Sequence, residues 1–265
     1  MRPPFRCIFC NNDSPFSSVE HIVPESLGND IVILDKGWVC DKCNNIISAV
    51  EGRVIYKSIL GIERCRLGVI TKEKKPARSE TYNITWFAKP DKPQNVLEAE
   101  TDWSNYPIIW NANFSAGEIA IPFHDETCED MARFLLKIGI EITAVAKQMN
   151  DPDIKNDFSE AKSYVLGLSK DLWPYFVIRS SDLEKHVTSI FENSLQEHDY
   201  IRSCKFDIFL HLVEDEVVMF FEYGNYYAGI ALTSRKTAWK TILQKWNLPY
   251  VGCPIQFQNE TWPRM

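Results

Sequence analysis

Two pairs of closely spaced cysteines constrain the fold of this chain more than any other feature of its sequence. Cys7 and Cys10 form one C-x2-C pair, and Cys40 and Cys43 form a second pair after an interval of 29 residues. Two such pairs can present four thiolates in the tetrahedral arrangement of a closed structural zinc site. Thiolates favour zinc over magnesium or calcium, and redox chemistry is the alternative that the pattern leaves open. We therefore predict a zinc-bound module near the N-terminus.

The composition predicts a folded chain in a reducing compartment. The 265 residues are 45% hydrophobic, which is enough to bury a core. No apolar run approaches the roughly 20 residues that cross a bilayer, and the N-terminus lacks the pattern of a signal peptide. We expect a cytoplasmic protein without membrane contact, in which clustered cysteines bind metal. The four scattered cysteines are expected to be small buried apolar residues: Cys65, Cys128, Cys204 and Cys253.

The segment between the two cysteine pairs is long enough to hold secondary structure of its own. Residues 17–23 and 31–40 contain β-favouring runs, and the turn-forming sequence PESLGND separates them. These patterns predict two short antiparallel strands joined by a loop, followed by a helix over residues 44–60. His21 then ends the first strand and Asn44 begins the helix, so folding can bring the two side chains together.

Beyond residue 68 the patterns predict a mixed α+β body with an antiparallel sheet. Residues 69–80 are polar and charged, and we expect them to connect the module of residues 1–68 to a body of residues 81–265. The clearest helix is predicted over residues 127–149, where apolar residues recur every three or four positions. The other expected elements are strands over 82–89, 106–114 and 117–123, helices over 158–168, 181–196 and 237–246, and a meander over 206–234.

Charge is distributed unevenly along the chain, whose net charge is −7. Residues 1–78 carry 12 Lys and Arg against 9 Asp and Glu, whereas the remainder carries 17 against 27. A basic segment attracts a phosphate backbone and an acidic segment repels it. The distribution favours contact with nucleic acid through the N-terminal part.

The residues in and between the cysteine pairs resemble a known family. The combination of C-x2-C, EHIVPESLGN and C-x2-C-NN is similar to the HNH endonucleases, the zinc-bearing branch of the ββα-metal nucleases. The likeness is strongest to stand-alone bacterial proteins with an EHI-x-P-x-S-L-G signature, and it covers residues 5–60. It implies a zinc-stapled ββα-metal HNH module in front of the α+β body.

The resemblance also implies roles for single residues, carried over by position. His21 would be the general base that activates water. Glu20 and Asn44 would bind a catalytic divalent ion. Asp35 stands about where the family has the Asn that orients the base, which is a departure from the family pattern.

Each of these residues also has a structural interpretation. Asn44 suits the N-cap of a helix, a role that is compatible with metal ligation. Glu20 can be a surface carboxylate on a strand, and His21 can be a buried histidine bonded to a neighbour. Two further candidate members of the site are Asn45 and Glu51.

Hydrolysis of a phosphodiester bond explains why these residue types would occur together. An imidazole titrates near neutral pH and can take a proton from water. A hard cation held by oxygen ligands stabilises charge on the phosphate and on the leaving oxygen. The resemblance therefore implies Zn²⁺ for folding and Mg²⁺ or Mn²⁺ for catalysis.

The resemblance implies DNA, most often double-stranded, as the substrate, and a place in bacterial antiviral defence. The body is expected to bind a protein partner or a small-ligand trigger. The basic side chains expected to contact phosphates are Lys42, Arg53, Lys57, Arg64 and Arg66. Two alternatives stay open, which are a metal-dependent RNase and a non-catalytic zinc-stabilised protein that binds nucleic acid or regulates a partner.

Overall fold

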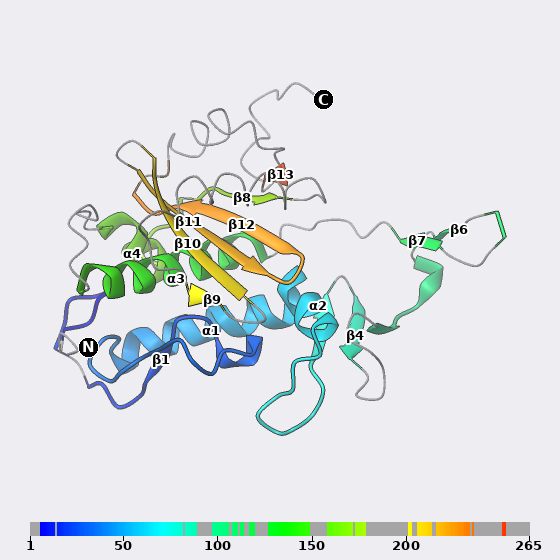
Figure 1. The fold of residues 1–265 in the computed structure, drawn as a ribbon, viewed down its shortest axis with the longest axis horizontal. Helices are drawn as coiled ribbons and strands as arrows, with labels where there is room; N and C mark the ends of the chain where they lie inside the picture. Colours follow the sequence, from blue (N-terminus) through cyan, green and yellow to red (C-terminus); the bar gives the residue numbers. More distant parts are fainter. Residues whose placement is uncertain are drawn as a thin grey trace.

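The computed structural model in Figure 1 describes the chain in segments. These are residues 6–13, 15–81, 83–88, 97–105, 108–110, 112–113, 117–119, 127–148, 158–171, 173–178, 201–202, 206–213, 216–233, 235 and 251–252. The helices expected over 181–196 and 237–246 lie outside them, as do Cys204 and Cys253. No helix in these segments is long and apolar enough to span a membrane.

The N-terminal module has the predicted order of two strands and a helix. Strand β1 (Glu20–His21) pairs antiparallel with β2 (Ile33–Leu34), and His21 lies opposite Ile33. A 3-10 turn, η1 (Glu25–Leu27), lies in the connecting loop and ends at Gly28, whose φ of 90° suits glycine. Helix α1 (Asp41–Lys57) follows the second cysteine pair.

The predicted helix over 44–60 is confirmed in its middle and corrected at its ends. It begins at Asp41, because Cys40 takes the extended N-cap position. It stops before Ser58, which is extended at φ −112° and ψ 177° and accepts a hydrogen bond from Leu60 N on its side chain. Ser58 is therefore the N-cap of a second helix, α2 (Ile59–Arg66), and the chain changes direction there.

A small antiparallel sheet follows α2. Its strands are β3 (Arg78–Thr81), β4 (Ile84–Ala88) and β5 (Leu97–Glu100), in that order. The strand predicted over 82–89 is β4. The sheet covers α2 with its own apolar cluster, which contains Ile62, Cys65, Val69, Ala77, Ile84 and Trp86.

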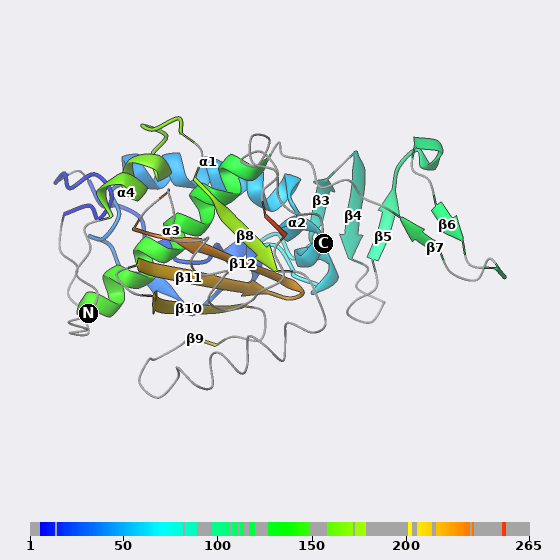
Figure 2. The ribbon, with the colours of Figure 1, turned by 90° about the horizontal axis from the view of Figure 1, so that it is seen from above.

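A ribbon of two strands extends beyond this sheet. After η2 (Trp103–Asn105), strands β6 (Ile108–Trp110) and β7 (Gly117–Ile119) pair with each other. Figure 2 shows that this ribbon points away from the rest of the molecule. The two strands predicted over 106–114 and 117–123 correspond to β6 and β7 within the described residues, and positions 106–107, 111, 114 and 120–123 lie outside them.

The body is built on one antiparallel sheet of order β13-β8-β12-β11-β10-β9. Its long strands β10 (Phe206–Val213), β11 (Glu216–Tyr223) and β12 (Tyr226–Ala231) form the predicted meander. The shorter strands are β8 (Tyr175–Ile178), β9 (Ile201–Arg202) and β13 (Val251–Gly252). Two helices pack together beside the sheet, α3 (Cys128–Gln148) and α4 (Ser159–Val165), where helices were predicted.

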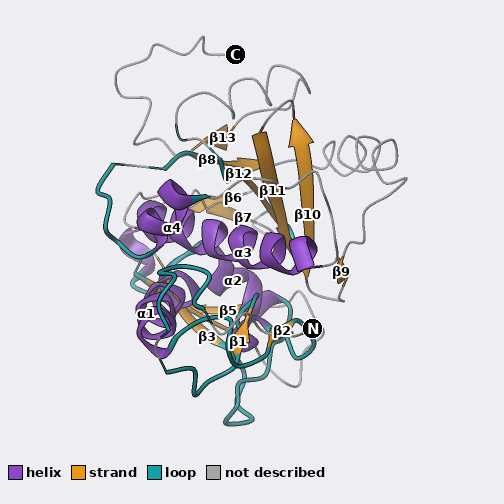
Figure 3. Ribbon diagram, turned by 90° about the vertical axis from the view of Figure 1, so that its left-hand side faces the viewer, coloured by secondary structure: helices purple, strands orange, loops and turns teal. Residues whose placement is uncertain are grey.

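Helix α3 lies between the sheet of the body and the N-terminal module, as Figure 3 shows. It packs on α1 on one side and on β11 and β12 on the other. One buried apolar cluster therefore runs from Trp38 and Ile47 through Phe134 to Phe221. The α+β fold is confirmed. The division into residues 1–68 and 81–265 stays a prediction, and the two parts share this core.

Candidate functional site

The four cysteines of the two pairs converge on one point. Their Sγ atoms all lie within 4.8 Å of one another, and Cys10 Sγ is 3.7 Å from Cys40 Sγ. Cys40 is the N-cap of α1 and Cys43 lies in its first turn, so the helix start fixes the second pair. The first pair sits in a tight turn that Asn11 N closes by donating to Cys7 O at 2.8 Å.

The donor set of this cluster fits zinc. Zn–S bonds of about 2.3 Å in a tetrahedron place the sulfurs about 3.8 Å apart, which is close to the Cys10–Cys40 separation. A hydrogen bond from Cys43 lowers the pKa of Cys7 to about 4, although burial opposes the shift, and the same contact raises the pKa of Cys43. Several thiolates this close repel one another, and a bound cation removes that repulsion. These residues would hold a structural Zn²⁺.

His21 presents its imidazole at the edge of the module. Its side chain is 23% exposed, and Nε2 lies 3.9 Å from Glu25 Oε2, which also pairs with Lys72 at 2.6 Å. His21 Nδ1 is buried and has no hydrogen-bond partner among the described residues. Two exposed apolar side chains are close in the fold, Ile33 opposite it and Val19 two residues before it. The imidazole is accessible, with one ring nitrogen facing a carboxylate.

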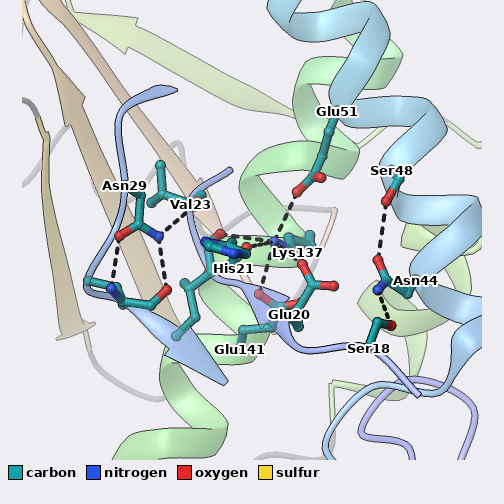
Figure 4. Close-up of polar contacts among 12 residues, drawn as sticks. Ser18, Glu20, His21, Val23, Asn29, Asn44, Ser48, Glu51, Lys137 and Glu141 are labelled. Carbon is teal, nitrogen blue, oxygen red and sulfur yellow. Dashed lines mark hydrogen bonds and ion pairs between the residues drawn. The ribbon is translucent and has the colours of Figure 1, made fainter. Parts of the chain in front are cut away.

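Asn29 fixes the loop that follows His21. Its side chain is buried, and Nδ2 donates to Val23 O at 2.6 Å and to Val32 O at 2.9 Å. Its Oδ1 accepts from Ile31 N at 3.1 Å and from Val32 N at 2.8 Å. One side-chain amide therefore holds the two ends of this loop together, and Figure 4 shows Asn29 with these hydrogen bonds. The sequence analysis missed this residue, and the Gly-Asn turn was the available signal.

Asn44 links the start of α1 to Ser18, in the segment that leads into β1. Its Nδ2 donates to Ser18 Oγ at 2.8 Å, and its Oδ1 accepts from Ser48 Oγ at 3.1 Å. Ser18 lies two residues before Glu20 in the chain. Asn44 caps no helix with its side chain, because Cys40 holds the N-cap position. The amide is thus placed against the strand that carries Glu20 and His21.

Glu20 points into the protein, where it meets a lysine from α3. Glu20 is 5% exposed, and its Oε1 lies 2.7 Å from Lys137 Nζ. The same Nζ lies 2.9 Å from Glu51 Oε1 and 3.1 Å from Glu141 Oε2. It also donates to the main-chain oxygens of His21 and Ile22. Figure 4 shows Lys137 at the centre of this group.

The buried cluster contains more acidic groups than basic ones. Burial raises the pKa of Glu141 well above its ordinary value, and Lys137 offsets only part of that effect. Burial likewise raises the pKa of Glu51. Burial opposes the charge on Lys137, but Glu141, Glu20 and Glu51 together raise its pKa well above its ordinary value. The cluster therefore places three carboxylates around one ammonium, and burial and mutual repulsion favour the protonated form of the carboxylates while the carboxylates favour the charged form of Lys137.

Sequence reasoning missed Lys137 and Glu141. Both lie in the most apolar part of the helix predicted over 127–149, four residues apart. Two opposite charges at that spacing inside an apolar helix were the available signal, because buried charges are rare unless paired.

Of the remaining predicted site residues, two lie at the surface and one lies in the interior. Asp35 is exposed and directly follows β2, and Asn45 is exposed on α1. Glu51 belongs to the buried lysine cluster. Within the described segments, neither Asp35 nor Asn45 forms a hydrogen bond or ion pair with His21. The structure gives Asp35 no orienting bond to the imidazole, so that role stays a prediction.

The five basic residues predicted to contact phosphates are not equally available. Lys42 and Lys57 are exposed. Arg53 is partly exposed and forms a two-pronged ion pair with Asp130 of α3, at 2.6 and 2.7 Å. Arg66 is held by Glu63 at 2.6 Å.

Arg64 is a correction to the predicted phosphate contacts. Its side chain is 2% exposed and stacks over the ring of Tyr56 at 5.5 Å. A guanidinium at that depth cannot reach a phosphate on the surface. Arg64 was expected at the surface from its place among other basic residues, but the folded chain buries it beside Tyr56.

The comparisons with known proteins agree with this geometry. Residues 7–51 match the family model described as HNH endonuclease. The match includes both cysteine pairs, β1, β2 and the first part of α1, and the suspected family is thereby confirmed for this segment. Searches of curated proteins and of solved structures found no match.

Proposed function

We propose that the N-terminal module is a divalent-metal-dependent endonuclease that hydrolyses phosphodiester bonds of DNA. The hydrogen bond from Asn44 to Ser18 carries the proposal, because it sets the start of α1 against the strand that bears Glu20 and His21. The family match over residues 7–51 supports a nuclease of this general class.

His21 would act as the general base. Its imidazole is partly exposed, so it can meet a water molecule beside a bound phosphate. Glu25 Oε2 lies 3.9 Å from Nε2, so a carboxylate faces the ring nitrogen on the partly exposed side of the imidazole. No other histidine in the described segments lies on β1 or α1.

Glu20 and Asn44 would hold the catalytic Mg²⁺ or Mn²⁺. A carboxylate has two oxygens, and Lys137 contacts Oε1 of Glu20, which leaves the second oxygen as a possible ligand. Asn44 adds an amide oxygen, and such hard donors suit these ions. When bound, the ion would supply charge stabilisation on the phosphate and the leaving oxygen.

DNA would be held by basic side chains at the surface of the module. Lys42 and Lys57 are exposed on α1, and Arg53 would join them only where its pair with Asp130 opens. The body would bind a protein partner or a small-ligand trigger, and the whole protein would act in bacterial antiviral defence. This wider role rests on resemblance.

Plasmid cleavage tests the proposal. The wild-type protein, loaded with zinc, should nick or linearise supercoiled DNA when Mg²⁺ or Mn²⁺ is added. The variant His21→Ala should lose activity by about 10²- to 10⁴-fold, the contribution of a general base, while its zinc content and melting temperature stay unchanged. Equal cleavage by both proteins would contradict the proposal. Cleavage of RNA in place of DNA would select the RNase alternative, and cleavage of neither would select the binding protein.

A further inference from the structure

Lys137 reaches the candidate site from a distant part of the chain. It lies on α3 of the body, 116 residues after His21, and its side chain is 1% exposed. Its ammonium meets Glu20 Oε1 at 2.7 Å and donates to the main-chain oxygens of His21 and Ile22, the latter at 3.0 Å. Three consecutive residues of the site are thus held by one side chain (Figure 4).

The contacts of Lys137 satisfy two main-chain oxygens at the end of β1. Strand β1 has only two residues, which pair with β2. Isolated pairings this short are weak, and buried carbonyls need donors. Lys137 donates to His21 O at the end of the strand and to Ile22 O just after it.

Stability alone does not explain a lysine at this position. Replacing a buried ion pair by apolar residues of similar size is often neutral or stabilising. The neighbours of Lys137 on α3 include the buried apolar residues Phe134 and Ile138 and the buried Glu141 one turn on. A wholly apolar cluster of similar volume would serve stability as well, so the polar group is better explained by what Lys137 holds.

We propose that Lys137 is a positioning residue of the nuclease site, which orients the Glu20 carboxylate and the main chain at His21. This inference rests on the proposed function. A carboxylate fixed through one oxygen presents the other in a single direction, and preorganised ligands bind an ion more tightly than mobile ones. The body would thereby be required for metal binding by the module.

Binding of Mn²⁺ to the zinc-loaded full chain, followed by electron paramagnetic resonance without nucleic acid, tests the inference. The variant is Lys137→Met combined with Glu51→Gln, which removes one basic and one acidic group and keeps Glu20. It is compared with Glu51→Gln alone, so that only Lys137 differs. Asp130→Asn is the matched control, because it breaks the Arg53 contact between α1 and α3 but no contact to β1.

We expect the double variant to fold, to retain zinc, and to bind Mn²⁺ at least tenfold more weakly than Glu51→Gln, while Asp130→Asn binds Mn²⁺ as the wild type does. The Mg²⁺ concentration for half-maximal cleavage by the double variant should rise by a similar factor. An unchanged Mn²⁺ affinity in the folded double variant would overturn the inference. If the double variant does not fold, Lys137→Gln is measured in its place, and an unchanged Mn²⁺ affinity again overturns the inference. If neither variant folds, the role of Lys137 is purely structural, and the inference is overturned as well.

The outcomes separate this inference from the proposed function. Mn²⁺ binding that depends on Lys137 in a protein that cuts neither DNA nor RNA would contradict the nuclease and keep the positioning role. Cleavage that depends on His21 but not on Lys137 would support the nuclease and contradict the positioning role of Lys137.

Discussion

Alternation along β1 sends the two side chains of the Glu-His pair to opposite sides. Successive residues of a strand face opposite ways, so Glu20 points to the interior and His21 to the surface. The imidazole is therefore accessible from solvent, whereas the Glu20 carboxylate forms an ion pair with Lys137 in the interior. Each residue has the environment that its proposed role requires.

At the scale of residues, local spacing predicted the cysteine cluster and missed the side chains that contact Glu20 from elsewhere in the fold. The four cysteines lie within one short segment, so spacing and motif sufficed to bring them together, whereas metal ligation by Asn44 stays a prediction. Lys137 lies 116 residues from His21, and only the packing of α3 on the module brings them together. Arg64 was misplaced because local spacing does not report its burial in the folded chain.

Asn29 provides a test at this scale. Asn29→Ala removes four hydrogen bonds and takes away the partners of the buried Val23 O and Val32 N, whereas Val32 O still accepts from Ile22 N. We expect a loss of about 3 kcal/mol in the free energy of unfolding, since each unpaired buried group costs about 1–3 kcal/mol. Urea denaturation measures this change in the free energy of unfolding. Asp30→Ala, an exposed neighbour in the same loop, is the control, and equal midpoints for the two variants would refute the assigned role.

At the scale of elements, the hydrophobic pattern predicted the long helix and the meander. Helix α3 spans Cys128–Gln148 against a prediction of 127–149. The pattern did not predict the break at Ser58, because the apolar spacing continues through it into α2. The capping hydrogen bond from Leu60 N to Ser58 Oγ decides that break, and a serine amid apolar residues is a weak signal.

Two helical glycines should respond in opposite ways to alanine. A Cβ on Gly52 of α1 would meet no atom within 4 Å, so Gly52→Ala should stabilise the protein by about 1 kcal/mol through helix propensity. A Cβ on Gly139 of α3 would lie 2.5 Å from Leu232 Cδ2, and Leu232 is fully buried. Overpacking costs about 1–3 kcal/mol, so Gly139→Ala should destabilise the protein. Thermal melting of both variants checks the signs, and a gain for Gly139→Ala would contradict the packing described here.

At the scale of the whole molecule, the N-terminal module and the body share one core. Trp38 beside the zinc cluster and Trp173 beside α4 belong to the same buried cluster. The sequence suggested a module, a connector and a body, because a polar stretch separates them. That stretch instead carries an isolated bridge from Ile70 to Pro76 and leads directly into β3. Sequence patterns do not report which faces of distant elements meet.

Removal of zinc should therefore destabilise the body as well as the module. Structural zinc contributes about 10–16 kcal/mol of binding free energy in small modules, and the shared core transmits its loss. We expect a chelator to lower the temperature of a single cooperative transition followed by tryptophan fluorescence. Cys40→Ser should have the same effect and bind no zinc, whereas Cys65→Ala, which alters a buried cysteine outside the cluster, should retain one zinc per chain. A body transition unaffected by the chelator would show two independent cores.

The proposal that His21 activates water is tested most directly by chemical rescue. Plasmid DNA is incubated with zinc-loaded His21→Ala and Mg²⁺ while the concentration of free imidazole is raised. If the side chain serves as the general base, added imidazole should restore part of the cleavage in a saturable manner and leave the wild-type rate unchanged. Wild-type cleavage by His21→Ala without imidazole would contradict the account.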